Sequence, residues 1–489
     1  MTYSPLLRSL FDEPDGSLFP VIEARLKKGE NPDAGSKYGE TPLVQAYRRG
    51  RMDVFSLLLD HGADLSAMRW GPLHRAVALG DMEELQSAAK YGDMSARDVE
   101  GLTPFLLACE MGEIVKAAFL LPLAQQEDKY ARYQQTPALA LAAAKGRTEM
   151  VRWLLKNRFE VNEADEFGGT ALIAAAAAGE VETVRILLEA GADIAARYNL
   201  SASVRNIDLS ELDLPPLSAG FDEFEFFQTA ASESEDADVA RLLIGAGAEP
   251  HELESSVLRE LTGAALIPTQ HITSEIYETQ KNRIFGTRNP EPVSYEFWLE
   301  MVRSGEPAYW GRTRFGKKKR AHDGPAVWSF DRYGMSTTAL PDNVWVQIAG
   351  EHEDHYDTDF CIYNDVVVHD GKGGAQIYTY PREVFPPTDF HTATLVGDAI
   401  ILIGSLGYQD ERRVGETQVL RLNLEDFSID RIDTTGPSPG WISRHRARLD
   451  GDRIVVWDGK VWDGADYAAL VGAYALSLST GVWEKVDQE

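Results

Sequence analysis

The sequence DEFGGTALIAAAAAGEVETVRILLEAGADI, residues 165–194, decides the fold of the N-terminal half of the chain. It contains two short segments with apolar residues at helical spacing, separated by Gly179. Thr170 stands where it can cap the first helix, and Gly191 stands where the second can end in the left-handed conformation. One hairpin of this size cannot bury its own apolar residues, so we expect similar hairpins stacked on both sides.

The same pattern recurs upstream at nearly constant spacing. Its anchor, the first residue of the first helix, is in turn Pro42, Pro72, Pro104, Pro137 and Ala171. The steps between successive anchors, by subtraction of their numbers, are 30, 32, 33 and 34. Proline suits this position because it presets φ for the first helical turn. The period and the pattern resemble the ankyrin repeat. The resemblance implies an α-solenoid over residues 1–267, with a capping repeat at 1–36.

In such a stack, the residue four positions before each anchor lies near the tip of a loop, and these loops form a rim. This row reads Tyr38, Met68, Glu100, Tyr133 and Phe167, with Trp70 beside Met68. Aromatic residues and methionine are enriched in the cores of protein interfaces, so we expect these six residues to contact a partner. The alternative is that they pack neighbouring loops against each other.

An acidic insertion interrupts the solenoid pattern at about residues 198–226. No lysine or arginine occurs between Arg205 and Arg241, whereas carboxylates and phenylalanines alternate there. Such a segment can steer and anchor a basic protein, and its candidate contacts are Asp222, Glu223, Phe224 and Glu225. The alternative is a solubilising loop whose phenylalanines pack into the solenoid.

Residues 268–324 form a connector, which we expect to hold short helices and a basic loop. From residue 325 to 489, apolar and polar residues alternate as they do in β-strands. Three copies can be aligned, and two of them open at His391 and His445, a step of 54 along the chain. This pattern resembles the kelch repeat and implies a partial β-propeller of about three blades. Because propellers usually have four to eight blades, three alternatives stay open: a further blade in the connector, an open array, or a homodimer that closes the array.

Two segments contain groups that could perform chemistry. His352, Asp354, His355, Asp357 and Asp359 could hold a metal ion, but their spacing matches no ligand motif, so we interpret them as a solvated loop. Residues 311–318 have the glycine spacing of a phosphate-binding loop, but Lys318 replaces the required serine or threonine. We therefore predict no cofactor and no catalytic site.

The composition narrows the classes of partner. The formal net charge of −29 argues against nucleic acid or an anionic membrane as the main partner and favours a basic protein. Cys109 and Cys361 are the only cysteines, which excludes a disulfide framework and indicates a reducing compartment. We see no signal peptide and no apolar run long enough for a membrane helix, and we expect a cytoplasmic protein.

The overall prediction is a multidomain protein with an ankyrin-repeat α-solenoid followed by a kelch-like all-β domain. Its predicted function is non-enzymatic binding of a basic protein through the rim and the acidic insertion, as an immunity or inhibitor protein. One alternative is an adaptor that joins two partners. The other is a metal-dependent enzyme with its site in the kelch-like domain.

Overall fold

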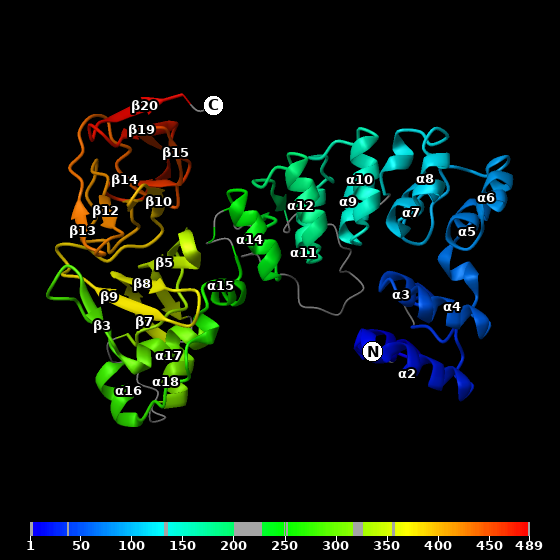
Figure 1. Ribbon diagram of the computed structural model, residues 1–489, viewed down its shortest axis with the longest axis horizontal. Helices are drawn as coiled ribbons and strands as arrows, with labels where there is room; N and C mark the ends of the chain where they lie inside the picture. Colours follow the sequence, from blue (N-terminus) through cyan, green and yellow to red (C-terminus); the bar gives the residue numbers. More distant parts are fainter. Residues whose placement is uncertain are drawn as a thin grey trace. The chain divides into compact units, whose positions relative to one another are not determined.

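The computed structural model describes residues 3–36, 39–131, 135–199, 227–248, 250, 253–315, 326–354 and 357–487. Its contacts divide the chain into two compact units, residues 1–230 and residues 231–489 (Figure 1). We call them the helical unit and the β-rich unit. None of the described helices is long and apolar enough to cross a membrane.

The helical unit is a series of helical hairpins, as the repeat pattern predicts (Figure 1). The second helix of each hairpin buries apolar residues such as Leu58, Leu154 and Leu187 against its neighbours. The helices are α1 (Pro5–Asp12), α2 (Asp15–Lys27), α3 (Pro42–Arg48), α4 (Met52–Asp60), α5 (Pro72–Ala78), α6 (Met82–Ala89), α7 (Pro104–Met111), α8 (Ile114–Leu120), α9 (Ala138–Ala144), α10 (Thr148–Lys156), α11 (Ala171–Ala177) and α12 (Val181–Glu189).

The first helix of a hairpin begins where local capping rules predict. The hydroxyls of Thr41, Thr103 and Thr170 accept hydrogen bonds from the backbone N–H three residues later, at 3.3, 3.2 and 3.4 Å. These bonds satisfy N–H groups that have no partner within the helix. Neighbouring hairpins are also joined by His74, whose ring Nε2 lies 2.9 Å from the carbonyl oxygen of Leu102.

The predicted anchor at Pro137 is wrong by one residue. Helix α9 begins at Ala138, and Pro137 is its N-cap. Pro137 forms a β-bridge with Tyr130, in the place where Thr170 bridges Ala164 one repeat later. Gln135, three residues before this helix, has a positive φ of 52°, as Gly101 and Gly168 do at the same position before α7 and α11.

The β-rich unit contains several separate antiparallel sheets. Three of them include four strands that lie side by side in chain order, and among the described strands no sheet closes into a barrel or propeller. The larger sheets combine β3 (Glu291–Val293), β9 (Ala375–Thr379), β8 (Asp365–His369), β5 (Val344–Ile348) and β4 (Ser336–Leu340); β10 (Thr392–Val396), β11 (Ala399–Ile403), β12 (Val419–Asn423) and β13 (Ile429–Arg431); and β15 (Arg446–Asp450), β16 (Arg453–Trp457), β19 (Ala473–Ser477) and β20 (Trp483–Val486).

Two smaller sheets complete the described strands of this unit. One pairs β6 (Glu351–Asp354) with β7 (Asp357–Ile362), and the other orders β14 (Trp441–Ser443), β17 (Lys460–Trp462) and β18 (Tyr467–Ala469). In the helical unit, β1 (Tyr198–Asn199) pairs with β2 (Phe227–Gln228), so the residues on either side of the acidic insertion lie side by side.

A repeated hydrogen bond links the first strands of successive sheets. Nε2 of His391 lies 2.8 Å from the hydroxyl oxygen of Ser336 on β4, and Nε2 of His445 lies 3.0 Å from that of Thr392 on β10. Each histidine immediately precedes the first strand of the next sheet. The two histidines that the sequence aligns therefore have the same structural role.

Helices pack directly onto these sheets. α14 (Ala237–Gly245) and α15 (Ser255–Leu261) share a core with Trp345 of β5. Both helices belong to the β-rich unit, which begins at residue 231, whereas the sequence predicts that the solenoid extends to residue 267. The expected connector also joins this unit, because α16 (Ser274–Gln280) and α17 (Glu296–Ser304) pack against strand residues and β3 pairs with β9. The indole of Trp298 on α17 stacks on that of Trp328.

Candidate functional site

Three residues of the predicted rim are buried in the helical unit. The exposed fractions of Met68, Trp70 and Phe167 are 0, 4 and 9%. Trp70 packs against the rings of Tyr47 and Phe55, with centroids 5.9 and 5.4 Å apart. These side chains pack the repeats together, as the alternative interpretation proposed, and they cannot reach a partner without rearrangement.

The remaining predicted contacts divide into two groups. Glu100 is partly exposed and forms an ion pair with Arg48 at 2.8 Å. The others lie outside the described residues: Tyr38, Tyr133, Asp222, Glu223, Phe224 and Glu225. With α9 beginning at Ala138, the residue four positions before the anchor is Gln134 rather than Tyr133, and Gln134 also lies outside the described residues.

A polar network connects repeats that are far apart in sequence. The hydroxyl of Tyr47 donates to the carboxylate of Glu110, and burial together with this carboxylate raises the Tyr47 pKa. Lys145 Nζ lies 3.7 Å from Glu110 and donates to the carbonyl oxygen of Arg48 at 3.3 Å. Because these charged groups satisfy one another, we interpret the network as structural.

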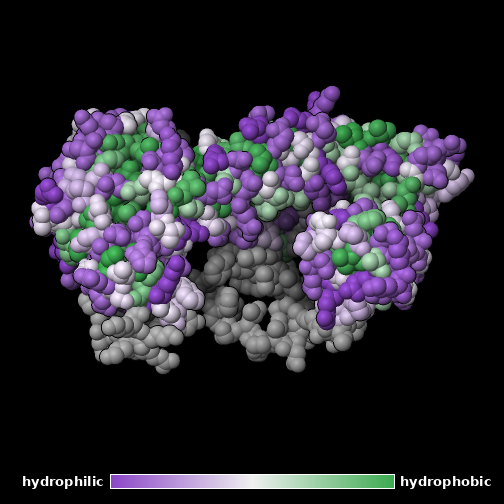
Figure 2. All heavy atoms as spheres, turned by 60° about the horizontal axis from the view of Figure 1, so that its bottom comes forward, coloured by the Kyte–Doolittle hydropathy of each residue, from purple (hydrophilic) through white to green (hydrophobic). Residues whose placement is uncertain are grey.

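A different part of the helical unit exposes apolar side chains. Of the five large apolar residues that the described part of this unit exposes, four lie in the two neighbouring hairpins α5–α6 and α7–α8. We call them the apolar patch, and their exposed fractions are 49, 95, 66 and 46% for Leu79, Tyr91, Val115 and Leu123. In the view of Figure 2 the surface is mostly hydrophilic, and hydrophobic side chains gather in small areas over each unit.

The two hairpins that carry the apolar patch are joined by a lysine. Lys116 Nζ donates to the carbonyl oxygens of Val77 at 2.6 Å and Gly80 at 3.0 Å. Leu79 directly follows α5 and Val115 lies at the start of α8, so both residues are at the end of their hairpin where its two helices are joined. Tyr91 and Leu123 each follow the end of the second helix of their hairpin.

The segments singled out for chemistry have structural roles where the structure describes them. Among the described residues, no group of three or more His, Cys, Asp or Glu side chains is placed to hold a metal ion. His352 is buried, with Nδ1 3.2 Å from the carbonyl oxygen of Asp331, and the other four candidate side chains lie outside the described part.

The expected loop at residue 311 is wrong, because residues 311–315 belong to α18 (Ala308–Phe315). The two lysines of that motif, Lys317 and Lys318, are not described.

Both cysteine thiols are buried and free. Burial raises the pKa of Cys109 and of Cys361, which keeps these thiols protonated. A thiol rather than a thiolate is a poor nucleophile and a poor metal ligand. We therefore interpret Cys109 and Cys361 as core residues.

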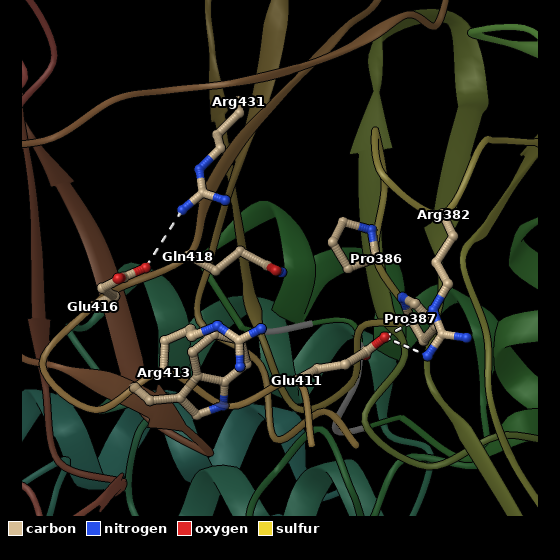
Figure 3. Close-up of a pocket in the computed structure, with 9 residues that line it drawn as sticks. Arg382, Pro386, Pro387, Glu411, Arg413, Glu416, Gln418 and Arg431 are labelled. Carbon is tan, nitrogen blue, oxygen red and sulfur yellow. Dashed lines mark hydrogen bonds and ion pairs between the residues drawn. The ribbon is translucent and has the colours of Figure 1, made fainter. Parts of the chain in front are cut away.

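The β-rich unit contains a groove of about 230 Å³ lined by arginines (Figure 3). Arg382 Nε donates to Glu411 Oε1 at 2.8 Å, and Arg431 Nη2 lies 3.8 Å from Glu416 Oε2. We call it the arginine groove, and its lining residues are Arg382, Pro386, Pro387, Glu411, Arg413, Glu416, Gln418, Arg431 and Trp441. Sequence reasoning missed it, because these residues come from four separate segments.

Comparison with known proteins identifies the repeats of the helical unit. Residues 38–70 match the family model of the ankyrin repeat, and residues 117–198 match the model of ankyrin repeats in three copies. The prediction of ankyrin repeats in the N-terminal half is therefore confirmed. Neither model covers the β-rich unit, whose likeness to kelch repeats stays a prediction.

Similar proteins match about a third of this chain. The chain is 29% identical over 188 residues to ankyrin repeat protein nuc-2 of Neurospora crassa, covering 35% of this chain and 17% of that protein. It is 33% identical over 164 residues to the putative palmitoyltransferase ZDHHC13 of Danio rerio, covering 32% and 25%. It is 29% identical over 185 residues to the E3 ubiquitin-protein ligase XBAT32 of Arabidopsis thaliana, covering 31% and 36%. The chain thus spans about a third or less of the length of these relatives.

Proposed function

We propose that this protein is a non-enzymatic binding protein that engages a protein partner through the apolar patch of its ankyrin repeats. The observation that supports this most directly is the exposure of Tyr91, at 95%, in one of two adjacent hairpins that carry three further exposed apolar residues. Aromatic side chains of this kind often contribute most to the affinity of an interface. Ankyrin repeats imply binding to other proteins, which agrees with this assignment.

The charges around the apolar patch favour a basic partner. Glu83 and Asp93 are exposed, as is Lys90 beside Tyr91, so these three side chains carry one more negative than positive charge. Together with the formal net charge of −29, these carboxylates would steer a cationic protein towards the patch. An immunity or inhibitor protein that covers a basic toxin or enzyme is one version of this function. The acidic insertion is a second candidate contact for the same partner.

Site-specific photo-crosslinking tests the proposed surface. A benzophenone side chain is introduced at Tyr91, and the matched control carries it at Tyr333, which is 65% exposed and lies in the β-rich unit. In an extract of the source cells, we expect the label at position 91 to yield one covalent adduct with a basic protein. The control should not yield that adduct. Equal adducts at both positions would show non-specific capture and would refute the proposal.

Two further variants separate the apolar patch from the insertion. Val115→Asp should abolish the adduct without lowering the thermal stability, because the Val115 side chain is 66% exposed. Glu223→Lys combined with Glu225→Lys should weaken the adduct only if the insertion also contacts the partner. If both variants retain the full yield, the patch and the insertion are not the binding surface.

A further inference from the structure

We propose that the arginine groove of the β-rich unit binds an acidic peptide segment in which a carboxylate side chain stands next to a large apolar one. This ligand is opposite in charge to the basic partner proposed for the helical unit, and its site lies in the other compact unit. The proposal makes the protein an adaptor with two ligands of different chemistry.

The arginine groove carries more positive than negative charge. Of its three arginines, Arg382 and Arg431 are paired with carboxylates of the groove itself. Arg413 donates only to the backbone oxygens of Asp410 at 3.1 Å and Arg412 at 3.2 Å, and it has no carboxylate partner among the described residues. The lining therefore has one uncompensated positive charge, which a single ligand carboxylate would balance.

The arginine groove is built on a loop that hydrogen bonds hold in place. Arg413 lies between β11 and β12, and the neighbouring Arg412 anchors this loop by donating to the carbonyl oxygens of Leu406 at 3.0 Å and Gly407 at 3.1 Å. The Arg412 guanidinium also stacks 4.9 Å from the ring centroid of Trp462. A loop that is held in place before binding loses less conformational entropy when a ligand arrives.

The arginine groove also has an apolar wall. Pro386, Pro387 and Trp441 line the groove, and the indole N–H of Trp441 is already bonded to the carbonyl oxygen of Leu406 at 3.1 Å. Trp441 is 8% exposed, so the wall offers a limited apolar surface and no free donor, which suits contact with an apolar side chain. A volume of about 230 Å³ is below the roughly 300–1,000 Å³ of typical small-molecule sites, and it favours one or two side chains of a peptide.

The remaining polar atoms select a peptide rather than phosphate. Glu411 and Glu416 line the same groove. A phosphate dianion would be repelled by these two carboxylates more strongly than a single ligand carboxylate would be. The groove also offers one uncompensated arginine, which is too few for a dianion.

Fluorescence anisotropy with the full chain and a labelled synthetic peptide tests this inference. The peptide GFDEFEFFQT, the sequence of residues 220–229, already places carboxylates next to phenylalanines. The control peptide GFNQFQFFQT replaces each carboxylate with an amide and keeps the shape. We expect the acidic peptide to bind, with an affinity that falls as salt rises, and the amide peptide to bind at least tenfold more weakly.

Matched variants locate the binding site. Arg413→Gln should weaken binding of the acidic peptide at least tenfold, whereas Arg421→Gln should leave it unchanged, because Arg421 lies on β12 outside the groove and pairs with Asp398. Inorganic phosphate should not displace the peptide at matched ionic strength. No binding, equal effects of the two variants, or displacement by phosphate would each overturn the inference. Crosslinking at Tyr91 is measured separately, so either proposal can fail without the other.

Discussion

Replacing Asp365 by asparagine should lower the free energy of unfolding of the β-rich unit by about 3–5 kcal/mol, the usual cost of removing one partner from a buried ion pair. Asp365 pairs with Arg332, and the two side chains are 3% and 1% exposed. Its Oδ2 also accepts the indole N–H of Trp328 at 2.7 Å. Asparagine has nearly the same shape but leaves the Arg332 guanidinium buried without a counter-charge.

The neighbours of this ion pair limit how far the structure can relax. The Arg332 guanidinium lies 3.5 Å from the ring centroid of Tyr363 and donates to the carbonyl oxygen of Ala349 at 3.0 Å. Moving it into water would break these contacts as well. The loss should therefore approach the full cost of a buried, unpaired charge.

Urea unfolding followed by tryptophan fluorescence measures this effect, because Trp328 stacks on Trp298 at 4.5 Å close to the ion pair. With an m-value of about 3 kcal/mol/M, the midpoint should fall by about 1–2 M. The matched control is Asp398→Asn, since Asp398 is 80% exposed in its pair with Arg421, and such pairs contribute only about 0–1 kcal/mol. Equal shifts for the two variants would refute the reasoning.

A double variant tests the same reasoning from the other side. Arg332→Met combined with Asp365→Leu removes both charges, so no unpaired ion remains in the core. It should regain more than half of the stability that Asp365→Asn loses, although Trp328 still lacks an acceptor. A double variant no more stable than the single one would show that hydrogen bonds or packing, rather than charge, dominate at this position.

Three further outcomes are expected. Burial raises the pKa of Asp98 to about 6, so the folded helical unit binds a proton more tightly than the unfolded chain does. The free energy of unfolding of this unit should therefore fall by up to about 3 kcal/mol as pH rises from 4 to 7. Urea titrations of Asp98→Asn should lack this dependence on pH. Burial lowers the pKa of His445 to about 3, so the β-rich unit should lose stability as pH falls from about 6.5 towards 3. If the stability of His445→Gln fell with pH just as steeply, His445 would not be the group responsible. Trp345→Ala should lower the free energy of unfolding by about 3–5 kcal/mol and speed proteolysis within α14 and α15, because Trp345 is buried against these helices. An unchanged cleavage rate would show that the helices do not depend on this contact.

Local rules explain why the helical hairpins could be predicted. Threonine caps, proline in the first turn and glycine after the second helix act within a few residues of one another. The same rules misplaced the fourth anchor, because proline is tolerated at the N-cap as well as at the first helical position. In the structure α9 begins three residues after the positive φ of Gln135, the same spacing that separates Gly101 from α7 and Gly168 from α11.

Exposure along the predicted rim could not be derived from the repeat pattern. The step from Pro42 to Pro72 is the shortest of the series, and the short 3₁₀ helix at Leu65–Met68 lies in this segment. Met68 and Trp70 are then enclosed within the same unit, Trp70 by the rings of Tyr47 and Phe55. Sequence indicates that such residues are apolar, but their contacts decide whether they face a partner or the core.

The sequence by itself determined the repeated hairpins, the change to β-structure and the equivalence of His391 and His445, because helical and strand periodicities and turn residues act over short distances. Tertiary structure alone decided that α14 and α15 join the β-rich unit, and that Asp365 and Arg332 are buried together. It also assembled the arginine groove from segments that are distant in the sequence, such as those of Arg382 and Trp441. These features depend on which surfaces meet when the sheets pack, and no short-range rule encodes that.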